Sequence, residues 1–321
     1  MKQSGEIRAG VWAALVVVCS ICAFAVPIDG PWIFDDLALI SGNRFVHDPS
    51  LWHHWFTSHL WDTNYHPGAQ PTLTFWRPAV LATFALDWRL GHGNPFVFHV
   101  TNLVLHAATS WLAFRTLARW SRSPVAAFVG AMFFALHPTK AESVAWIAGR
   151  PDILCAAGIF VAIWGVAMRL EGRRSGILLE IAGASLAYLA KEQAVVLPLF
   201  VIVEAWAVDR AWNLRTTLRA AAPHVLAALV YLAARHLWLP IGHASDPIPL
   251  TSHAAYVLES FARYIVLTFW PSDLSFGRAQ ISFVGLHPAP SGALVALGAI
   301  SLVAVGAAAW TCRKRAPGVT V

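Results

Sequence analysis

The stretch VWAALVVVCSICAFAVPIDGPWIFDDLALISGN, residues 11–43, decides the fold class. Its first part, Val11–Ile28, is apolar and long enough to cross a bilayer, which takes about 20 residues. Two adjacent carboxylates, Asp35 and Asp36, follow where the chain would leave the bilayer. Carboxylates near hydrocarbon are costly unless they are solvated, paired or used. We expect a retained anchor, with a cleaved signal peptide ending at Ala23-Phe24-Ala25 as the alternative.

The composition of the whole chain supports a membrane protein. Of 321 residues, 57% are hydrophobic and 12% are charged, whereas soluble domains average about 25% charged residues. The mean hydropathy is +0.57. The net charge of +6 does not indicate nucleic acid, because Lys and Arg fall in short clusters between apolar runs. Such clusters set the orientation of multi-pass membrane proteins.

Apolar runs recur along the chain and predict an all-α, polytopic helical bundle with about eight transmembrane helices. The runs are Val11–Ile28, Phe96–Leu117, Val125–Leu136, Ile153–Met168, Ile177–Ala190, Ala194–Val208, Ala220–Leu239 and Ser291–Thr311. By the positive-inside rule, the loops that carry the basic clusters between these runs lie in the cytoplasm. This requires the two runs around Lys191 and Glu192 to form a tight hairpin.

The same pattern predicts the domain organisation. We expect one transmembrane domain, residues 1–312, followed by a short basic cytoplasmic tail, residues 313–321. Residues 29–94 form a first extracytoplasmic loop and residues 241–290 form a second. Within these loops, Arg77–Gly91 predicts a helix lying on the interface, and Tyr256–Trp270 predicts an interfacial or re-entrant helix.

Polar residues from several loops gather on the extracytoplasmic side of this topology. Ionisable groups at membrane depth are candidates for function. The candidates are Asp35, Asp36, Asn43, Arg77, His99, Asn102, His106, His137, Lys140, Glu142, Arg150, Asp152, Lys191 and Glu192. Desolvation raises the pKa of a carboxylate, and a neighbouring carboxylate raises it further. One of the pair Asp35 and Asp36 can therefore act as a general base toward a hydroxyl.

Arginine and lysine suit a phosphate group. We therefore assign Arg77, Arg150 and Lys191 to binding a donor phosphate, whose departure develops negative charge that cations stabilise. Structural alternatives stay open for each group. The acidic pair can cap a short helix, and Arg150 can pair with Asp152. The stripe His99, Asn102 and His106 can bond neighbouring helices.

A metal is a further alternative. His99, His106 and His137 could bind one, although their spacing is not typical of a metal site. The acidic pair could also hold a divalent ion through oxygen ligands. No cofactor is indicated with certainty.

Five blocks of sequence, in order, resemble one family of membrane enzymes. They are FDDLALISGN (34–43), WRPAVLATFALDWRLGHGNPFVFHVTNLVLHA (76–107), FALHPTKAESVAWIAGRPDIL (134–154), AKEQAVVLP (190–198) and ARYIVLTFWPSDLSF (262–276). Together they are similar to the transmembrane-and-TPR protein O-mannosyltransferases and their bacterial relatives, within the GT-C glycosyltransferase superfamily. The tetratricopeptide repeats that usually end such proteins are not found in the 321 residues, and Lys140 stands where the family often has His.

The resemblance implies a GT-C bundle with its site on the extracytoplasmic side, in a bacterial inner membrane. It implies direct, inverting transfer of a sugar, with mannose the family-level expectation, from a polyprenyl phosphate to a hydroxyl of a protein or glycan. Asp35 and Asp36 match the acidic pair that carries the base or contacts the acceptor. Other positions that match family motifs are Glu142, Arg150, Asp152, Lys191 and Glu192.

Two other functions compete with a glycosyltransferase. A transporter or flippase for lipid-linked sugars would place charges or broken helices at the bilayer midplane. The interior candidates for that role are Glu180, Glu204, Pro198 and Pro223. A non-catalytic membrane scaffold would leave both aspartates dispensable.

Overall fold

The computed structural model describes residues 2–61, 75–209, 213–238, 250–272, 274 and 290–315. Every regular element in these ranges is helical. The chain divides into two compact units, residues 1–242 and 243–321, and each is described by itself. The expected single domain, 1–312, and the tail at 313–321 therefore stay predictions.

Long helices build the larger unit, and most of the predicted apolar runs coincide with one of them. They are α1 (Lys2–Phe24), α5 (Pro95–Ser121), α6 (Pro124–Leu136), α8 (Arg150–Leu170), α9 (Ser175–Ala190), α10 (Leu197–Asp209) and α11 (Leu214–Trp238). Interactions between neighbouring residues fix where several of these helices begin. Asn94 and Ser123 cap α5 and α6 through their side chains, and a proline stands in the first turn of each, where its missing N–H costs nothing.

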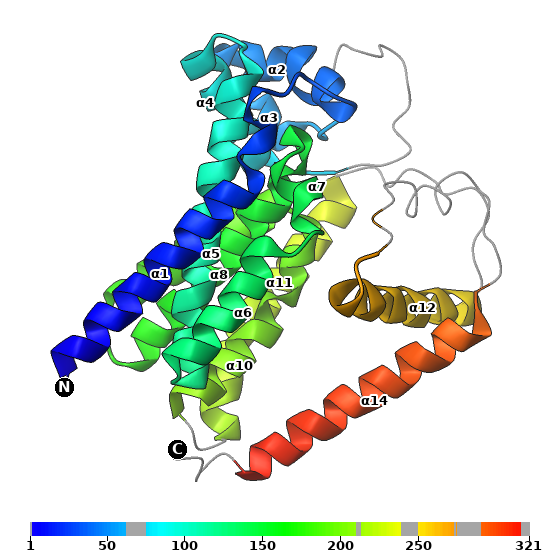
Figure 1. Ribbon diagram of the computed structural model, residues 1–321. Coiled ribbons are helices and arrows are strands. Elements are labelled where there is room, and N and C mark those ends of the chain that lie inside the picture. The colour runs from blue at the N-terminus through cyan, green and yellow to red at the C-terminus, as the bar shows by residue number, and fades with distance from the viewer. Residues whose placement is uncertain are drawn as a thin grey trace. The chain divides into compact units, whose positions relative to one another are not determined.

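Short elements gather at one end of this bundle (Figure 1). They are η1 (Val26–Asp29), η2 (Leu37–Ser41), α2 (Arg44–His47), η3 (Pro49–Leu51), α3 (His54–Thr57), α4 (Pro78–Gly91), α7 (Lys140–Val144), η4 (Ile147–Gly149) and η5 (Glu192–Val196). We call this the loop end. The opposite end, where α5 finishes and α8 turns into α9, is called the basic end. The helix predicted over Arg77–Gly91 is confirmed as α4.

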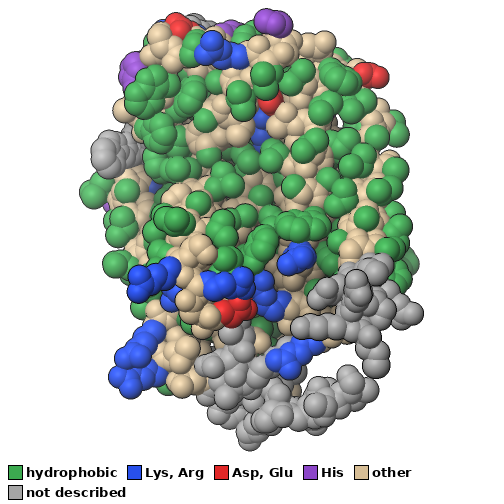
Figure 2. Space-filling model, turned by 90° about the vertical axis from the view of Figure 1, so that its left-hand side faces the viewer, with side chains coloured by type: hydrophobic (Ala, Val, Ile, Leu, Met, Phe, Trp, Pro, Cys, Tyr) green, Lys and Arg blue, Asp and Glu red, His purple; other side chains and the backbone are tan. Residues whose placement is uncertain are grey.

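The surface matches a membrane protein with two distinct rims. Figure 2 shows a wide band of hydrophobic side chains, with most of the visible Lys and Arg gathered below it and His above it. Large apolar side chains such as Leu178, Leu199 and Leu226 are more than half exposed. Exposed leucines on helices of this kind are expected where lipid replaces water.

Glycines bring α8 and α9 into contact along their backbones. A Cβ on Gly183 of α9 would lie 2.3 Å from the Ala162 nitrogen of α8, and a Cβ on Gly158 would lie 2.6 Å from the Ala187 nitrogen. Small residues at helix interfaces allow such close approach in membranes. The α8–α9 hairpin is therefore the tightest packing in the described bundle, and it brings the start of α8 beside the end of α9.

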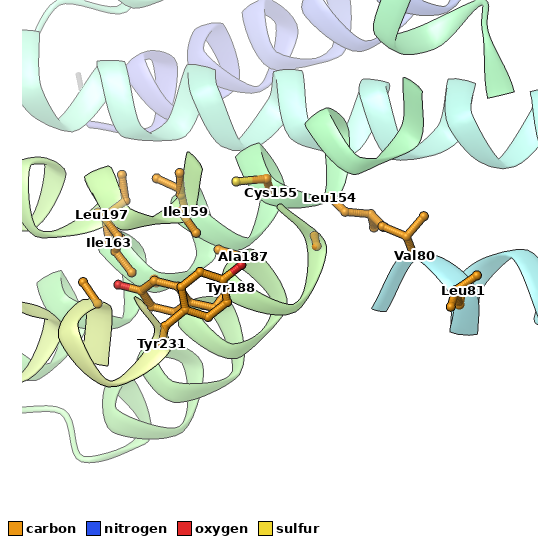
Figure 3. Packing of buried hydrophobic residues seen from close by; sticks show 14 of the residues in the cluster. Val80, Leu81, Leu154, Cys155, Ile159, Ile163, Ala187, Tyr188, Leu197 and Tyr231 are labelled. Carbon is orange, nitrogen blue, oxygen red and sulfur yellow. The ribbon is translucent and has the colours of Figure 1, made fainter. Parts of the chain in front are cut away.

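The core lies between these helices and α4, α10 and α11. Figure 3 shows Ile159 and Ile163 of α8 near side chains of α9, α10 and α11, and Leu154 of α8 beside Val80 of α4. The rings of Tyr188 and Tyr231 lie against each other, with centroids 5.2 Å apart. The loop η5 joins α9 to α10 as expected, but α10 packs mainly against α11 and α8. The turn around Lys191 is tight, as predicted, but α9 and α10 do not form a hairpin. The glycine contacts pack α9 against α8 instead.

Three helices are long and apolar enough to cross a membrane: Pro95–Ser121, Ile147–Leu170 and Leu214–Leu237. Shorter apolar helices cover Ala9–Phe24, Pro124–Leu136, Ser175–Ala190 and, in the smaller unit, Gly292–Ala307. A polytopic helical bundle agrees with these lengths, whereas the count of eight spans stays a prediction.

The smaller unit contains α12 (Leu250–Phe269) and α14 (Gly292–Arg315), which pack against each other. Gly298 makes this contact, since a Cβ there would lie 2.1 Å from the Leu258 carbonyl oxygen. The stretch predicted as interfacial or re-entrant forms most of α12, which is not among the candidate spans. Much of the predicted loop 241–290 lies outside the described residues.

Candidate active site

The acidic pair lies at the loop end, and the structure separates its two members. Asp36 is fully buried, and its carboxylate accepts hydrogen bonds from the backbone N–H groups of Ile33, at 3.1 Å, and Ala148, at 2.8 Å. Asp35 is half-buried, and no hydrogen bond or ion pair involves its carboxylate within the described ranges. Asp36 thus ties the first loop to η4 through a hydrogen bond, while Asp35 stays partly accessible.

The backbone is strained immediately before the acidic pair. Phe34 has a φ of 46°, a left-handed conformation that is unusual for a bulky residue and costs on the order of 1–3 kcal/mol. Strain of this kind persists where the surroundings fix it, and it clusters at functional sites. A π-helical turn, Leu37–Ser41, follows directly.

Burial raises the pKa of both carboxyl groups. Desolvation raises the pKa of Asp36 to about 6, with a smaller rise from the charge of Asp35, while the bonds from Ile33 and Ala148 oppose the rise. Desolvation also raises the pKa of Asp35. A carboxylate with a raised pKa is a stronger base near neutral pH than an ordinary aspartate.

A buried polar network lies beneath the loop end. The guanidinium of Arg150 is completely buried and pairs with Asp87 of α4 at 2.6 Å. It also donates to Asn102 at 2.6 Å and to the Phe98 carbonyl oxygen at 3.1 Å. Thr101 donates to the other oxygen of Asp87 at 2.8 Å. The network joins α4, α5 and α8, so it holds the helices that carry the candidate site.

This network corrects two expectations about Arg150. We predicted that it binds a donor phosphate, but its side chain is enclosed and committed to Asp87. The alternative pairing with Asp152 is also wrong, because residues two apart on a helix do not face each other. Arg150 instead lies within electrostatic range of Asp36, so it acts on the acidic pair from beneath.

Two further ion pairs lie at the loop end. Lys191 contacts both carboxylate oxygens of Asp152 at 2.7 Å, which ties the end of α9 to the start of α8. Arg77 pairs with Glu192 at 2.9 Å and stacks on the ring of Phe75, with its Cζ 4.3 Å from the centroid. The side chains of Lys191, Arg77 and Glu192 are 17%, 12% and 18% exposed, so a ligand can reach them.

The α7 segment adds a third cation. The Lys140 ammonium lies 4.7 Å from the centroid of the Phe134 ring. Desolvation lowers the pKa of Lys140, and the charge of Asp152 opposes this. Glu142 is exposed, and His137 contacts Thr139 at 2.8 Å. Lys140 therefore belongs with Lys191 around Asp152, whereas Glu142 and His137 lie at the edge.

Two members of the stripe on α5, Asn102 and His106, bond neighbouring segments, which agrees with the structural alternative. Asn102 donates to the Trp146 carbonyl oxygen at 3.2 Å, and one ring nitrogen of His106 lies 2.9 Å from the Ala135 carbonyl oxygen. His99 is buried beside Gly30. In the described ranges, no group of three His, Cys, Asp or Glu residues is arranged to hold a metal, so a metal role for the stripe or the acidic pair gains no support.

Sequence reasoning missed two groups of residues at this end. Asp87 and Thr101 complete the buried network, and Tyr231 packs 6.3 Å from Trp76, between ring centroids. A lone acid inside the apolar run of α4 is a signal that could have identified Asp87. No comparable signal marks Tyr231, since tyrosines are common near membrane interfaces.

The interior acids lie at the basic end and are paired. Glu180 contacts Arg169 at 2.6 Å and His224 at 2.8 Å. Glu204 contacts Arg119 at 2.9 Å and accepts from the Trp120 indole at 2.6 Å. Both glutamates stand within about two turns of a helix end that bears a basic cluster.

A groove of about 770 Å³ also opens between α1 and α5. Small apolar residues of α1 line it together with Trp111, Phe114, Arg115 and Arg119 of α5. None of the candidate site residues lines this groove, so it does not extend the site.

Comparison with known proteins places the chain beside one group of transferases. No protein-family model matches it, and no solved structure does. Protein O-mannosyl-transferase TMTC4 of Mus musculus is 30% identical over 212 residues, covering 57% of this chain and 28% of that protein. The Homo sapiens protein of the same name is 32% identical over the same shares. Protein O-mannosyl-transferase Tmtc1 of Drosophila melanogaster is 30% identical over 121 residues, 37% of this chain and 14% of that protein. The matches thus span less than a third of these relatives.

Proposed function

We propose that this protein is a membrane glycosyltransferase that moves mannose from a polyprenyl phosphate to a serine or threonine hydroxyl of a protein. One observation carries the proposal: the acidic pair and the cations meet at one end of the bundle. Asp36 is bonded to Ala148, and one helical turn further on Asp152 holds Lys191. The similarity to protein O-mannosyl-transferases supports the sugar and the acceptor.

Asp35 is the general base in this proposal. Its carboxylate is accessible and its pKa is raised by desolvation, whereas both oxygens of Asp36 are engaged by backbone N–H groups. Asp35 takes the proton from the acceptor hydroxyl while the hydroxyl oxygen forms a bond to C1 of the sugar. The bond from C1 to the phosphate oxygen breaks, and the polyprenyl phosphate leaves with the electron pair. One direct displacement inverts C1.

The leaving phosphate faces Lys191 and Lys140. Negative charge develops on it as the bond breaks, and preorganised cations stabilise that charge. Asp152 keeps Lys191 in place at 2.7 Å, while the Lys140 ammonium lies against the Phe134 ring. Arg150 positions the acidic pair from beneath and does not contact the substrate.

Orientation and location follow the charge pattern. The Lys and Arg clusters at the basic end belong in the cytoplasm by the positive-inside rule. The loop end then lies on the extracytoplasmic side, which in a bacterium is the periplasmic or outer side of the inner membrane.

The rival functions find less support. A transporter needs charges near the bilayer midplane, but Glu180 and Glu204 pair with arginines close to the basic end. A scaffold does not need an accessible acid held behind a strained residue, and Phe34 carries that strain at a φ of 46°.

The test is transfer of labelled mannose from polyprenyl-phosphate mannose to an acceptor peptide in membranes that contain the protein. We expect Asp35→Asn to lower transfer at least 100-fold, since general-base catalysis contributes roughly 10²–10⁴. Asp48→Asn is the matched control, because Asp48 lies exposed on the same loop and caps Ser50, a role that Asn fills equally.

The outcomes test the assignment of the base and the proposed function separately. Wild-type transfer that survives in Asp35→Asn removes the assignment of the base. Absence of transfer by the wild type, with protein present in the membrane, removes the proposed function. A parallel arm with EDTA reports whether a divalent metal takes part.

A further inference from the structure

Three buried polar atoms near the end of α11 have no hydrogen-bond partner in the described part of the chain. They are the hydroxyl oxygen of Tyr231, the Nε of Arg77 and one carboxylate oxygen, Oε1, of Glu192. Tyr231 is only 7% exposed. Buried polar groups are nearly always satisfied in native proteins, and an exception calls for a ligand, a water or an ion.

These atoms belong to one cluster drawn from three separate elements. Arg77 precedes α4 and Glu192 begins η5, and the two pair through other atoms, Nη2 and Oε2, at 2.9 Å. The Tyr231 hydroxyl, about two turns before the end of α11, lies within electrostatic range of both. The Trp76 ring packs beside Tyr231, with centroids 6.3 Å apart.

The donors and acceptors in this cluster are mixed. Arg77 Nε–H can only donate, Glu192 Oε1 can only accept, and the tyrosine hydroxyl can do either. A phosphate diester carries only acceptors and would leave Glu192 Oε1 without a donor. A sugar hydroxyl both donates and accepts, and aromatic rings such as Trp76 supply flat apolar contact area.

We propose that Tyr231, Arg77 and Glu192 form the subsite that binds the hydroxyls of the donor sugar, with Trp76 beside its ring. This inference rests on the proposed function. Arg77, which the sequence analysis assigned to the donor phosphate, is here assigned to the sugar. Lys140 and Lys191 remain assigned to the phosphate. Tyr231 is thereby a binding residue that the sequence did not indicate.

Tyr231→Phe tests the subsite with Tyr188→Phe as the matched control. Tyr188 is also 7% exposed and its ring packs on that of Tyr231, but its hydroxyl already donates to the His224 carbonyl oxygen at 3.4 Å. Transfer is measured against the concentration of polyprenyl-phosphate mannose, together with inhibition by polyprenyl phosphate that carries no sugar. The thermal unfolding midpoint of each purified protein in detergent is recorded.

We expect Tyr231→Phe to lower kcat/KM for the donor about tenfold, as loss of one substrate hydrogen bond does. Its unfolding midpoint should stay unchanged or rise, because the removed hydroxyl has no hydrogen-bond partner among the described residues. Inhibition by the sugar-free polyprenyl phosphate should not change. Tyr188→Phe should keep wild-type transfer and unfold at a slightly lower temperature.

Each other result overturns a defined part of the reasoning. Wild-type kinetics in Tyr231→Phe, beside an active wild type, refute the subsite and leave the proposed function intact. If inhibition by the sugar-free polyprenyl phosphate weakens as much as kcat/KM for the donor falls, Tyr231 contacts the phosphate and the sugar contact is refuted. A lower midpoint with reduced transfer assigns Tyr231 a structural role. No transfer by the wild type refutes the function and the subsite together.

Discussion

The buried pair of Arg150 and Asp87 allows the sharpest prediction for stability. Asp87→Asn keeps the shape of the side chain but leaves the fully buried guanidinium without its partner at 2.6 Å. Breaking a buried pair by removing one member costs about 3–5 kcal/mol. Asp36 still lies within electrostatic range of Arg150, and Asn102 and Phe98 still accept from it. We therefore expect the lower end, about 3 kcal/mol.

The assay is equilibrium unfolding of the purified protein in mixed detergent micelles, followed by tryptophan fluorescence. The series contains Asp87→Asn, Arg150→Met and the double variant. Each single change leaves the other member of the pair buried without its partner, whereas the double variant leaves neither. The double variant should therefore cost less than the sum of the single changes, by about 1–3 kcal/mol. Arg173→Met is the control, since the pair of Arg173 with Glu171 is 58% and 40% exposed and contributes at most about 1 kcal/mol.

Two results would refute this reasoning. Equal, small losses for Asp87→Asn and Arg173→Met would mean that the guanidinium is hydrated and the pair is not enclosed. Strict additivity in the double variant would mean that the two side chains act independently, which contradicts their contact.

Three further predictions use the acids, the cations and the glycines. Because the pKa of Asp36 is about 6 in the folded protein and 3.8 in the reference state, its contribution to stability is present below pH 4 and is lost as the pH rises through 6. The free energy of unfolding measured against pH should lose about 3 kcal/mol from this cause, and Asp36→Asn should abolish that loss. Lys191→Met should raise the KM for polyprenyl-phosphate mannose and weaken inhibition by polyprenyl phosphate, since the proposed function assigns Lys191 to the donor phosphate; unchanged values would remove it from the site. Gly183→Ala should destabilise the protein by about 1–3 kcal/mol in the same unfolding assay, because its Cβ would lie 2.3 Å from a backbone nitrogen. Gly10→Ala, with nothing within 4 Å, should not.

Hydropathy and charge along the chain were enough to predict the class of the fold. Apolar runs that cannot be solvated must form helices in lipid, and α1, α5, α8 and α11 all coincide with predicted runs. Helix starts followed local rules as well, because a cap such as Asn94 acts on its own next residues. The motif blocks also placed the candidate residues in one region of the bundle.

Partners in the site could not be predicted in the same way. Arg150 pairs with Asp87, 63 positions earlier, and not with Asp152 two positions later. Asp35 and Asp36 are equivalent in sequence, yet one is accessible and the other fully buried. Tyr231 carried no signal at all.

The physical reason is the range of the forces involved. Helix formation and membrane insertion depend on residues close in sequence, so the sequence by itself determined a helical membrane protein whose basic clusters gather at one end. Which charged groups meet depends on how whole helices pack, and contacts such as Gly183 against Ala162 set that packing. Tertiary structure alone therefore decided which acid is accessible, which arginine is buried and which tyrosine has a hydroxyl without a partner among the described residues.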